Sequence, residues 1–261
     1  MKLATWNVNS LAVRLPQLLE WLATQAATSP IDVLVLQETK LTDDKFPVAE
    51  IEAAGYAVQW FGQKTYNGVA LLSRKEHGVA TDVVKNIPGF ADDLARVITG
   101  TVGGIRIIGG YFPNGQAPDS EKFVYKLRWL DALRGFVNDE LTRHSRLVLL
   151  GDFNIAPEDR DVFDPVAWAG QIHCTPQERG HFQGLVSLGL VDAFRLFDQP
   201  PRLWSWWDYR NLAFRKNQGL RIDIIMVSEA LRSAVLACTI DKLPRKNERP
   251  SDHAPVVVEL A

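Results

Sequence analysis

Five short polar clusters lie directly beside apolar runs of the chain, at Asn7-Val8-Asn9, Gln37–Lys40, Tyr111–Gly115, Gly151–Asn154 and Ser251–His253. Their carboxylate oxygens are of the type that hard cations such as Mg²⁺ and Mn²⁺ prefer. Asparagine amides can donate hydrogen bonds to phosphate oxygens without adding repulsive charge. Together these residue types predict a site that holds a divalent cation and a phosphate group at once.

Asp223 differs from the other acidic residues because it lies within an apolar run, Arg221-Ile222-Asp223-Ile224-Ile225. A buried carboxylate without a partner costs roughly several kcal/mol, so it must be paired or hydrogen-bonded. We expect the partner of Asp223 to be His253.

Each polar cluster also has a purely structural interpretation. Residues 151–154 could form a turn with an Asx cap, residues 251–253 a turn that enters a strand, and residues 7–9 a polar strand edge. Their joint occurrence next to apolar runs favours the functional interpretation.

The apolar runs are short and rich in β-branched residues, which is typical of strands. They cover Lys2–Val8, Ile31–Gln37, Gly68–Ser73, Ile105–Phe112, Leu147–Leu150, Ile222–Val227 and Pro255–Leu260. Helical spacing is found in the leucines from Leu15 to Leu22 and in the apolar residues from Phe123 to Leu141. The residues around Ser120 are of the types that cap the start of a helix, so we expect the second helix to begin there. No linker or repeat interrupts the chain, so we expect one domain over residues 1–261 with a layered α/β or α+β body.

The composition narrows the class of protein. No stretch approaches the roughly 20 apolar residues that a membrane span requires, and the start MKLATWNVNS lacks the order of a signal peptide. Cys174 and Cys238 lie far apart without zinc-like spacing, which argues against a disulfide framework and a zinc site. We expect a soluble, cytoplasmic protein.

The net charge of −2 argues against binding nucleic acid by bulk electrostatics. Two local stretches are nevertheless basic: Arg210–Arg221 holds four basic and no acidic residues, and Lys242–Arg249 holds four basic and one acidic residue. These stretches either bind phosphates beside the metal-binding carboxylates or form solvated loops.

With these residues assembled, the sequence resembles the exonuclease III family of apurinic/apyrimidinic endonucleases, within the endonuclease/exonuclease/phosphatase superfamily that includes deoxyribonuclease I. The matching segments run in order from Trp6 to Val256 and are WNVNSL, LQETK, GVALLS, YFPNG, GDFNIAPEDRDV, TPQER, NQGLRIDIIMVS and SDHAPV. The resemblance implies a deoxyribonuclease I-like, four-layered α/β sandwich, with two mixed sheets face to face, helices outside, and the active site at one end of the sheets.

The resemblance also implies a magnesium site, with manganese as the alternative. Glu38 would be the principal ligand, Asn9 and Asp252 would lie close to the metal, and Asn7 would lie beside them. Relatives often carry aspartate where this chain has Asn9, so this second metal contact departs from the family pattern.

By the same resemblance, Asp152 would activate the attacking water or handle a proton, and His253, oriented by Asp223, would contact the scissile phosphate. The groups that would hold phosphate oxygens are Asn7, Tyr111, Asn114 and Asn154. The resemblance leaves the identity of the general base open. Hydrolysis would proceed by in-line attack of water on phosphorus, with release of the 3′ oxygen.

Trp204-Ser205-Trp206-Trp207 is an unusual density of indoles, which is either core material or, beside the basic stretch that begins at Arg210, part of a DNA-binding loop. In the family an apolar pocket here receives the baseless sugar, and its lining would be Trp206, Leu220 and Ile222. Leu220 replaces a larger aromatic residue of many relatives.

His173 stands where many relatives have a smaller or an aromatic residue. It either narrows the pocket, which favours 3′-end processing over internal incision, or lies in a solvated loop.

The implied substrate is duplex DNA with abasic sites, nicks or damaged 3′ ends, cut by a monomer in base excision repair. One rival is a phosphatase acting on inositol lipids or another small phosphoester, against which the Trp-rich and basic loops and TPQER count. The other rival is a DNA-binding scaffold without catalysis, against which the complete set of acidic residues and His253 counts.

Overall fold

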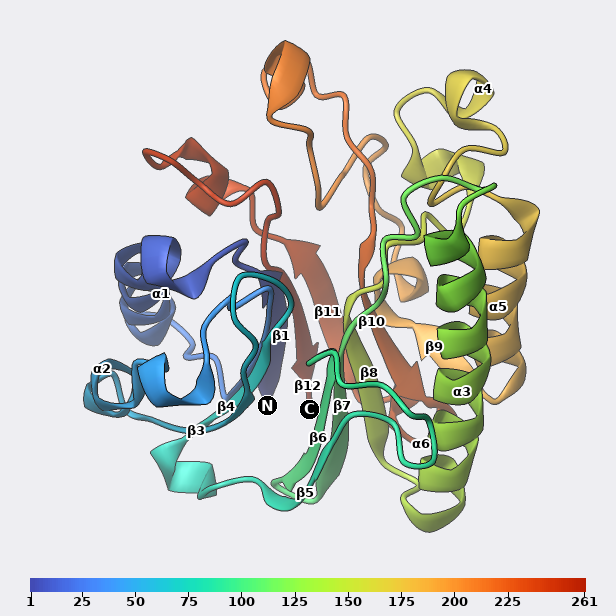
Figure 1. Ribbon diagram of the computed structural model, residues 1–261. Coiled ribbons are helices and arrows are strands. Elements are labelled where there is room, and N and C mark those ends of the chain that lie inside the picture. Colours follow the sequence, from blue (N-terminus) through green and yellow to red (C-terminus); the bar gives the residue numbers. More distant parts are fainter.

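The computed structural model describes residues 1–261 and contains two six-stranded β-sheets that pack face to face (Figure 1). The first sheet has the strand order β11-β12-β1-β2-β4-β3. Its strands are β1 (Lys2–Asn7), β2 (Val33–Gln37), β3 (Tyr56–Phe61), β4 (Val69–Arg74), β11 (Val235–Ile240) and β12 (Val256–Leu260). Only the β1–β2 pair is parallel.

The second sheet has the order β5-β6-β7-β8-β10-β9 and one parallel pair, β7–β8. Its strands are β5 (Thr81–Lys85), β6 (Val97–Val102), β7 (Ile105–Tyr111), β8 (Leu147–Asp152), β9 (Leu190–Asp192) and β10 (Asp223–Ser228).

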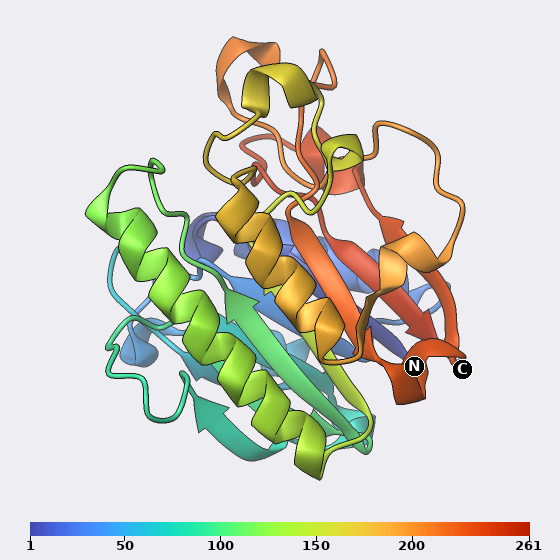
Figure 2. The same cartoon turned by 90° about the vertical axis from the view of Figure 1, so that its right-hand side faces the viewer.

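The chain has six α-helices, the longest of which cover the outer faces of the two sheets. The six helices are α1 (Leu11–Ala26), α2 (Val48–Ala53), α3 (Glu121–Arg143), α4 (Pro165–Trp168), α5 (Pro176–Ser187) and α6 (Glu229–Arg232). Short 3₁₀ turns lie at Asp43–Lys45, Lys75–His77, Asp159–Asp161, Ala193–Leu196, Arg210–Leu212 and Leu243–Lys246. Helices α1 and α2 lie outside the first sheet, and α3 and α5 lie side by side on the second sheet (Figures 1 and 2). None of these helices combines the length and apolar character needed to cross a bilayer.

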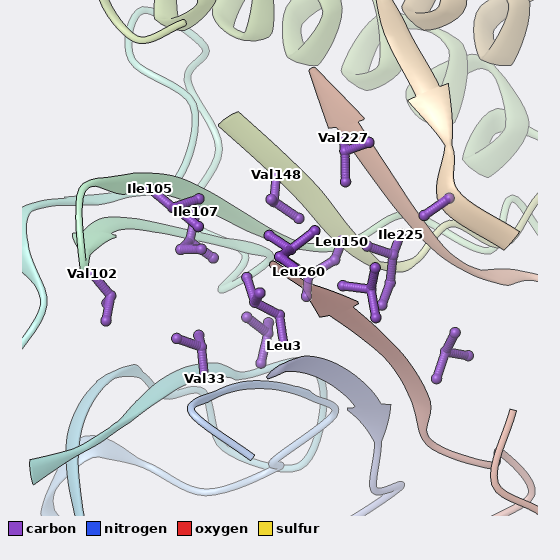
Figure 3. Packing of buried hydrophobic residues seen from close by; sticks show 14 of the residues in the cluster. Leu3, Val33, Val102, Ile105, Ile107, Val148, Leu150, Ile225, Val227 and Leu260 are labelled. Carbon is purple, nitrogen blue, oxygen red and sulfur yellow. The ribbon is translucent and has the colours of Figure 1, made fainter. Parts of the chain in front are cut away.

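The three largest apolar clusters separate four layers. The cluster between the sheets contains Leu3 and Val33 from the first sheet, which face Ile107, Val148 and Ile225 of the second (Figure 3). The other two clusters fill the spaces between each sheet and its helices. The helix–sheet–sheet–helix order is the four-layered sandwich that the resemblance implied.

The seven strands and two helices expected from the sequence are all present, with ends shifted by a few residues. The start of α3 is capped as predicted, because Ser120 Oγ accepts the Phe123 N–H at 3.1 Å. Strand β8 continues through Asp152, two residues beyond the expected end. The sequence missed β6 and the four edge strands β3, β5, β9 and β11. Edge strands are more exposed, so their apolar signal is weak.

Candidate active site

The polar clusters meet at one end of the two sheets. Strands β1 and β2 are parallel, as are β7 and β8, and the carboxyl ends of all four strands lie at this end. Strands β10 and β12 run antiparallel to β8 and β1, so Asp223 begins β10 here, opposite Asp152, and His253 precedes β12. Segments from across the whole chain therefore contribute to one site.

Asn7 joins the two sheets at this site. Its side chain is fully buried, and Nδ2 donates to Glu38 Oε1 at 2.8 Å and to Asp152 Oδ2 at 2.9 Å. One amide thus holds two carboxylates together and offsets part of their repulsion. The convergence of Glu38 with Asp152 that the sequence predicted is confirmed.

His253 lies between two buried carboxylates. Its Nδ1 is 2.9 Å from Asp223 Oδ2, and its Nε2 is 3.7 Å from Asp152 Oδ2. Asp223 therefore has the partner expected for it. Because Asp223 is an acceptor only, it fixes the Nδ1 proton and the orientation of the ring, which leaves Nε2 directed toward Asp152.

Burial and charge shift the pKa values of His253 and Asp152. Burial by itself lowers the pKa of His253, but Asp223, Asp152 and Asp252 outweigh it and raise the pKa above its ordinary value. Burial raises the pKa of Asp152, and the adjacent His253 offsets only part of this increase. His253 is therefore a buried cation, and the neighbouring Asp152 carboxylate binds a proton more readily than an ordinary aspartate. This pair is suited to proton transfer next to an anionic phosphate.

Asn154, Asn114 and Tyr111 surround the Asp152 carboxylate. The Asn154 N–H donates to Asp152 Oδ1 at 2.9 Å, and Asn114 Nδ2 donates to Asn154 Oδ1 at 3.2 Å. Burial, with the charges of Glu38 and Asp152, holds the pKa of the Tyr111 hydroxyl well above its usual value. The hydroxyl therefore stays protonated and can donate to a phosphate oxygen.

The donor atoms at this end fit a divalent cation. One oxygen each of Glu38 and Asp152 and one nitrogen of His253 lie within 4.8 Å of one another. Lys40 Nζ contacts Glu38 Oε2 at 2.9 Å and also Asn9 Oδ1, so these oxygens already face a positive charge. A set dominated by oxygen suits Mg²⁺ or Mn²⁺.

Asp252 and Asn9 lie beside this group and bond to each other. Asn9 Nδ2 donates to Asp252 Oδ1 at 3.0 Å, and Trp206 Nε1 donates to Asp252 Oδ2 at 3.0 Å. Both carboxylate oxygens of Asp252 thus accept hydrogen bonds from the protein. The compact ligand group contains Asp152, which the sequence assigned to proton transfer, and does not contain Asp252.

Lys126 supports the site and was missed by the sequence analysis. It is fully buried, and its Nζ donates to the carbonyls of Asn154 at 2.7 Å and Asn114 at 3.1 Å and to Glu178 Oε1 at 2.5 Å. Glu178, in TPQER, also forms a capping box with Thr175 at the start of α5. The sequence did contain a signal for this role, because Lys126 lies on the apolar helix face that carries Phe123 and Leu130. A lysine on a buried face is expected to have a partner, since an unpaired lysine is rarely buried.

The Trp-rich segment divides between core and site. Trp204 and Trp207 are buried core residues, whereas Trp206 is half-buried. His173 is 5% exposed, so the solvated-loop alternative is wrong. Its ring centroid lies 6.5 Å from that of Trp206, and its Nδ1 donates to the Asn154 carbonyl at 2.7 Å. Leu220, expected to line the sugar pocket, has no exposed surface.

Arg210 and Arg221 correct the prediction of one continuous basic stretch. Arg221 is buried and pairs with Asp161 at 2.6 Å and Asp192 at 2.7 Å, so it faces no phosphate. Arg210 is exposed, but Asp208 binds it through two carboxylate oxygens, at 2.9 and 2.6 Å. The partners of Arg221 lie far away in sequence, and those pairs could not be seen in the local composition.

The three remaining histidines are His77, His144 and His181. All three are half-buried, and each lies within 4.0 Å of a carboxylate. The shortest contact joins His77 Nε2 to Asp32 Oδ1 at 3.0 Å. Arg74 pairs with the same aspartate, so this cluster is neutralised internally.

The burial of His173 predicts sensitivity of the fold to acid. Burial, aided by the Lys126 ammonium, lowers the pKa of His173 to about 4 in the folded protein. The unfolded chain takes up this proton below roughly pH 6.5, so the stability contributed is full above that pH and is lost as pH falls toward the folded pKa. At pH 5 the loss is about 2 kcal/mol. In urea titrations at pH 7 and pH 5, His173→Asn should show a smaller pH-dependent loss than wild type; an equal loss would contradict the prediction.

Comparisons with known proteins agree with this geometry. The model of the Endonuclease/Exonuclease/phosphatase family matches residues 4–253. Exodeoxyribonuclease III of Haemophilus influenzae is 35% identical over 273 residues, which cover 100% of both chains. Among solved structures, the 3′ phosphatase NExo from Neisseria, bound to a product DNA hairpin, is 50% identical with a TM-score of 0.95, covering 100% of this chain and 99% of that one.

An AP endonuclease from Archaeoglobus fulgidus is 35% identical, with a TM-score of 0.93 over 100% of this chain and 99% of that one. The similarity thus extends over the whole chain, including both sheets and their helices. The chain belongs to the endonuclease/exonuclease/phosphatase family and is a nuclease of the exonuclease III type.

Proposed function

We propose that this chain is a magnesium-dependent DNA repair nuclease that hydrolyses phosphodiester and phosphomonoester bonds at abasic sites, nicks and damaged 3′ ends of duplex DNA. The single observation that carries the proposal is the meeting of Glu38, Asp152 and His253, whose ligand atoms lie within 4.8 Å of one another. The names of the relatives, a 3′ phosphatase, an exodeoxyribonuclease and an AP endonuclease, support this range of substrates. We propose that it acts as a single-domain monomer in the cytoplasm, where the buried free thiols of Cys174 and Cys238 fit a reducing compartment.

Asp152 and His253 have complementary tasks in the proposed reaction. Water attacks phosphorus in line with the bond to the 3′ oxygen, and Asp152 takes the proton that the water releases. His253, held by Asp223, places its cation against the phosphoryl oxygens as their negative charge grows. The bond to the 3′ oxygen breaks, and this oxygen takes up a proton from solvent to become a 3′-hydroxyl. The phosphate remains as the 5′-phosphate of the other product, or leaves as inorganic phosphate when the substrate is a 3′-phosphate end.

The proposed metal site uses side chains that lie at the ends of strands of the first sheet. Glu38 is the principal ligand, and Asn9, Asp252 and Asn7 lie close to it. When bound, the divalent cation supplies Lewis-acid stabilisation of the phosphoryl oxygens. The contacts of Lys40 with Glu38 and Asn9 support this assignment, because a positively charged group already lies against both of these oxygens.

Removal of the metal should abolish activity. We expect EDTA to stop cleavage of a labelled duplex and added Mg²⁺ to restore it. Glu38→Gln should raise the magnesium concentration for the half-maximal rate by on the order of 10–100-fold or more, because it removes a ligand charge. Glu52→Gln, an exposed change in α2, is the matched control. A full rate of cleavage in EDTA would refute the metal dependence.

We also propose that His173 narrows the pocket beside Trp206 and thereby favours 3′-end processing over internal incision. Support comes from the packing: His173, Leu220 and Ile222 are 5%, 0% and 2% exposed, so little room is left for a baseless sugar. The Trp168 and Trp206 rings flank the imidazole, with centroids 6.3 and 6.5 Å away.

His173→Gly tests the pocket with little backbone strain, because His173 has a φ of 72°, which glycine adopts readily. We expect the ratio of internal abasic-site incision to 3′-phosphate removal to rise by about tenfold or more, the scale of discrimination by pocket fit. Rates are measured on two duplexes that differ only in the lesion. His173→Asn, which also tolerates this backbone, keeps a polar side chain, and an unchanged ratio in both variants would exclude the idea.

A further inference from the structure

A hollow of about 420 Å³ lies between the Trp-rich loop and the loop that precedes Asp252. Its lining consists of Phe214, Asn217, Lys242, Leu243 and Lys246. We call it the rim hollow. Neither of its lysines takes part in the active site described above, and the two loops that form it stand at the end of the sheets where that site lies (Figure 1).

The loops around the rim hollow are held firmly. The Arg245 guanidinium is buried and stacks over Trp207 at 5.7 Å, Tyr209 at 5.8 Å and Phe214 at 4.8 Å. The same side chain donates to the carbonyl of Ser251, directly before Asp252. The hollow therefore has a fixed position relative to the active site, as a built binding site requires.

The charge of the rim hollow is not neutralised by the protein. No carboxylate lies within 4.0 Å of the ammonium of Lys242 or Lys246, in contrast to Lys40 and Lys126, which are paired. Exposed Arg215 and Lys216, next to the lining residue Phe214, and exposed Arg249 likewise have no acidic partner. The chain as a whole has a net charge of −2, so attraction for a polyanion must come from a local group of this kind.

We propose that the rim hollow binds the sugar–phosphate backbone of the DNA substrate at a distance from the reacting phosphate. Lys242 and Lys246 contact phosphates, and Phe214 and Leu243 supply an apolar wall for the sugars between them. The hollow adds affinity and does not take part in the chemistry. This inference rests on the proposed function, since it assumes a DNA substrate.

The test compares Lys242→Gln/Lys246→Gln with wild type on one duplex. The variant should raise KM by on the order of tenfold, because two phosphates lose their partners. Its kcat should stay within about twofold of wild type, since contacts that bind substrate and transition state equally change KM alone. The slope of log affinity against log salt should fall in magnitude by about 2, one unit for each lysine. The control is Lys75→Gln/Arg146→Gln, which removes the same charge from exposed positions beside the amino-terminal ends of β2 and β8.

The outcomes separate this inference from the proposed function. An unchanged KM and salt slope in the variant, or changes equal to those of the control, would overturn the rim hollow while leaving the nuclease intact. A loss of kcat without a change in KM would also overturn it, because the effect would then arise at the reacting centre. Thermal unfolding checks that both variants remain folded. A wild-type protein that cuts no duplex at any magnesium concentration would instead refute the proposed function.

Discussion

Asp152→Asn is expected to lower kcat on a 3′-phosphate duplex by about 10²–10⁴-fold or more, the contribution of one positioned proton acceptor. The substitution keeps the shape of the side chain but removes its charge and most of its proton affinity. KM should change little, because Asn114 and Tyr111 remain available to the phosphate.

The hydrogen bonds around Asp152 add to the expected loss. Oδ1 accepts from the Asn154 N–H, and Oδ2 accepts from Asn7 Nδ2. An asparagine amide has one oxygen and one NH₂ group, so one of these donors would face another donor. Asp198→Asn, an exposed change, is the control. A folded Asp152→Asn protein with the wild-type rate would exclude Asp152 from the chemistry.

His253→Gln is expected to lower kcat by about 10²–10³-fold, the cost of removing one donor that stabilises charge in the transition state. Glutamine is polar but carries no charge, and the buried cation beside the scissile phosphate is lost. Steady-state rates at saturating DNA and magnesium measure the effect. His181→Gln, in α5, serves as control, and an equal loss in that variant would contradict the assignment.

Asp223 should act only through His253. We expect the double variant Asp223→Asn/His253→Gln to lose no more kcat than His253→Gln alone, because a residue that orients another contributes nothing once that other residue is gone. The double variant should also unfold at a higher temperature than His253→Gln, which leaves the buried Asp223 carboxylate without its partner. Multiplicative losses in kcat would show that Asp223 contacts the reaction independently.

The exposure and pairing of three side chains, Arg221, Lys126 and His173, could not be predicted from the sequence for one physical reason. The local sequence places Arg221 in a basic stretch that either binds phosphates or is solvated, although Asp161, 60 residues away, neutralises it. Lys126 was overlooked on an apolar helix face, although Glu178 and two carbonyls satisfy it. His173 was left between a pocket and a solvated loop. In each case exposure depends on partners that only the folded chain brings near.

The sequence by itself determined the residue types of the site and most of the central strands, because apolar runs and the polar clusters at their ends are local patterns. It also determined the pairing of Asp223 with His253, since a carboxylate within an apolar run needs a partner. Only the tertiary structure decided that Asn7 links Glu38 of one sheet to Asp152 of the other, and that Asp152 lies among the metal-type ligands while both oxygens of Asp252 are bonded elsewhere. These relations depend on how two sheets with non-sequential strand orders face each other, and no local spacing encodes that arrangement.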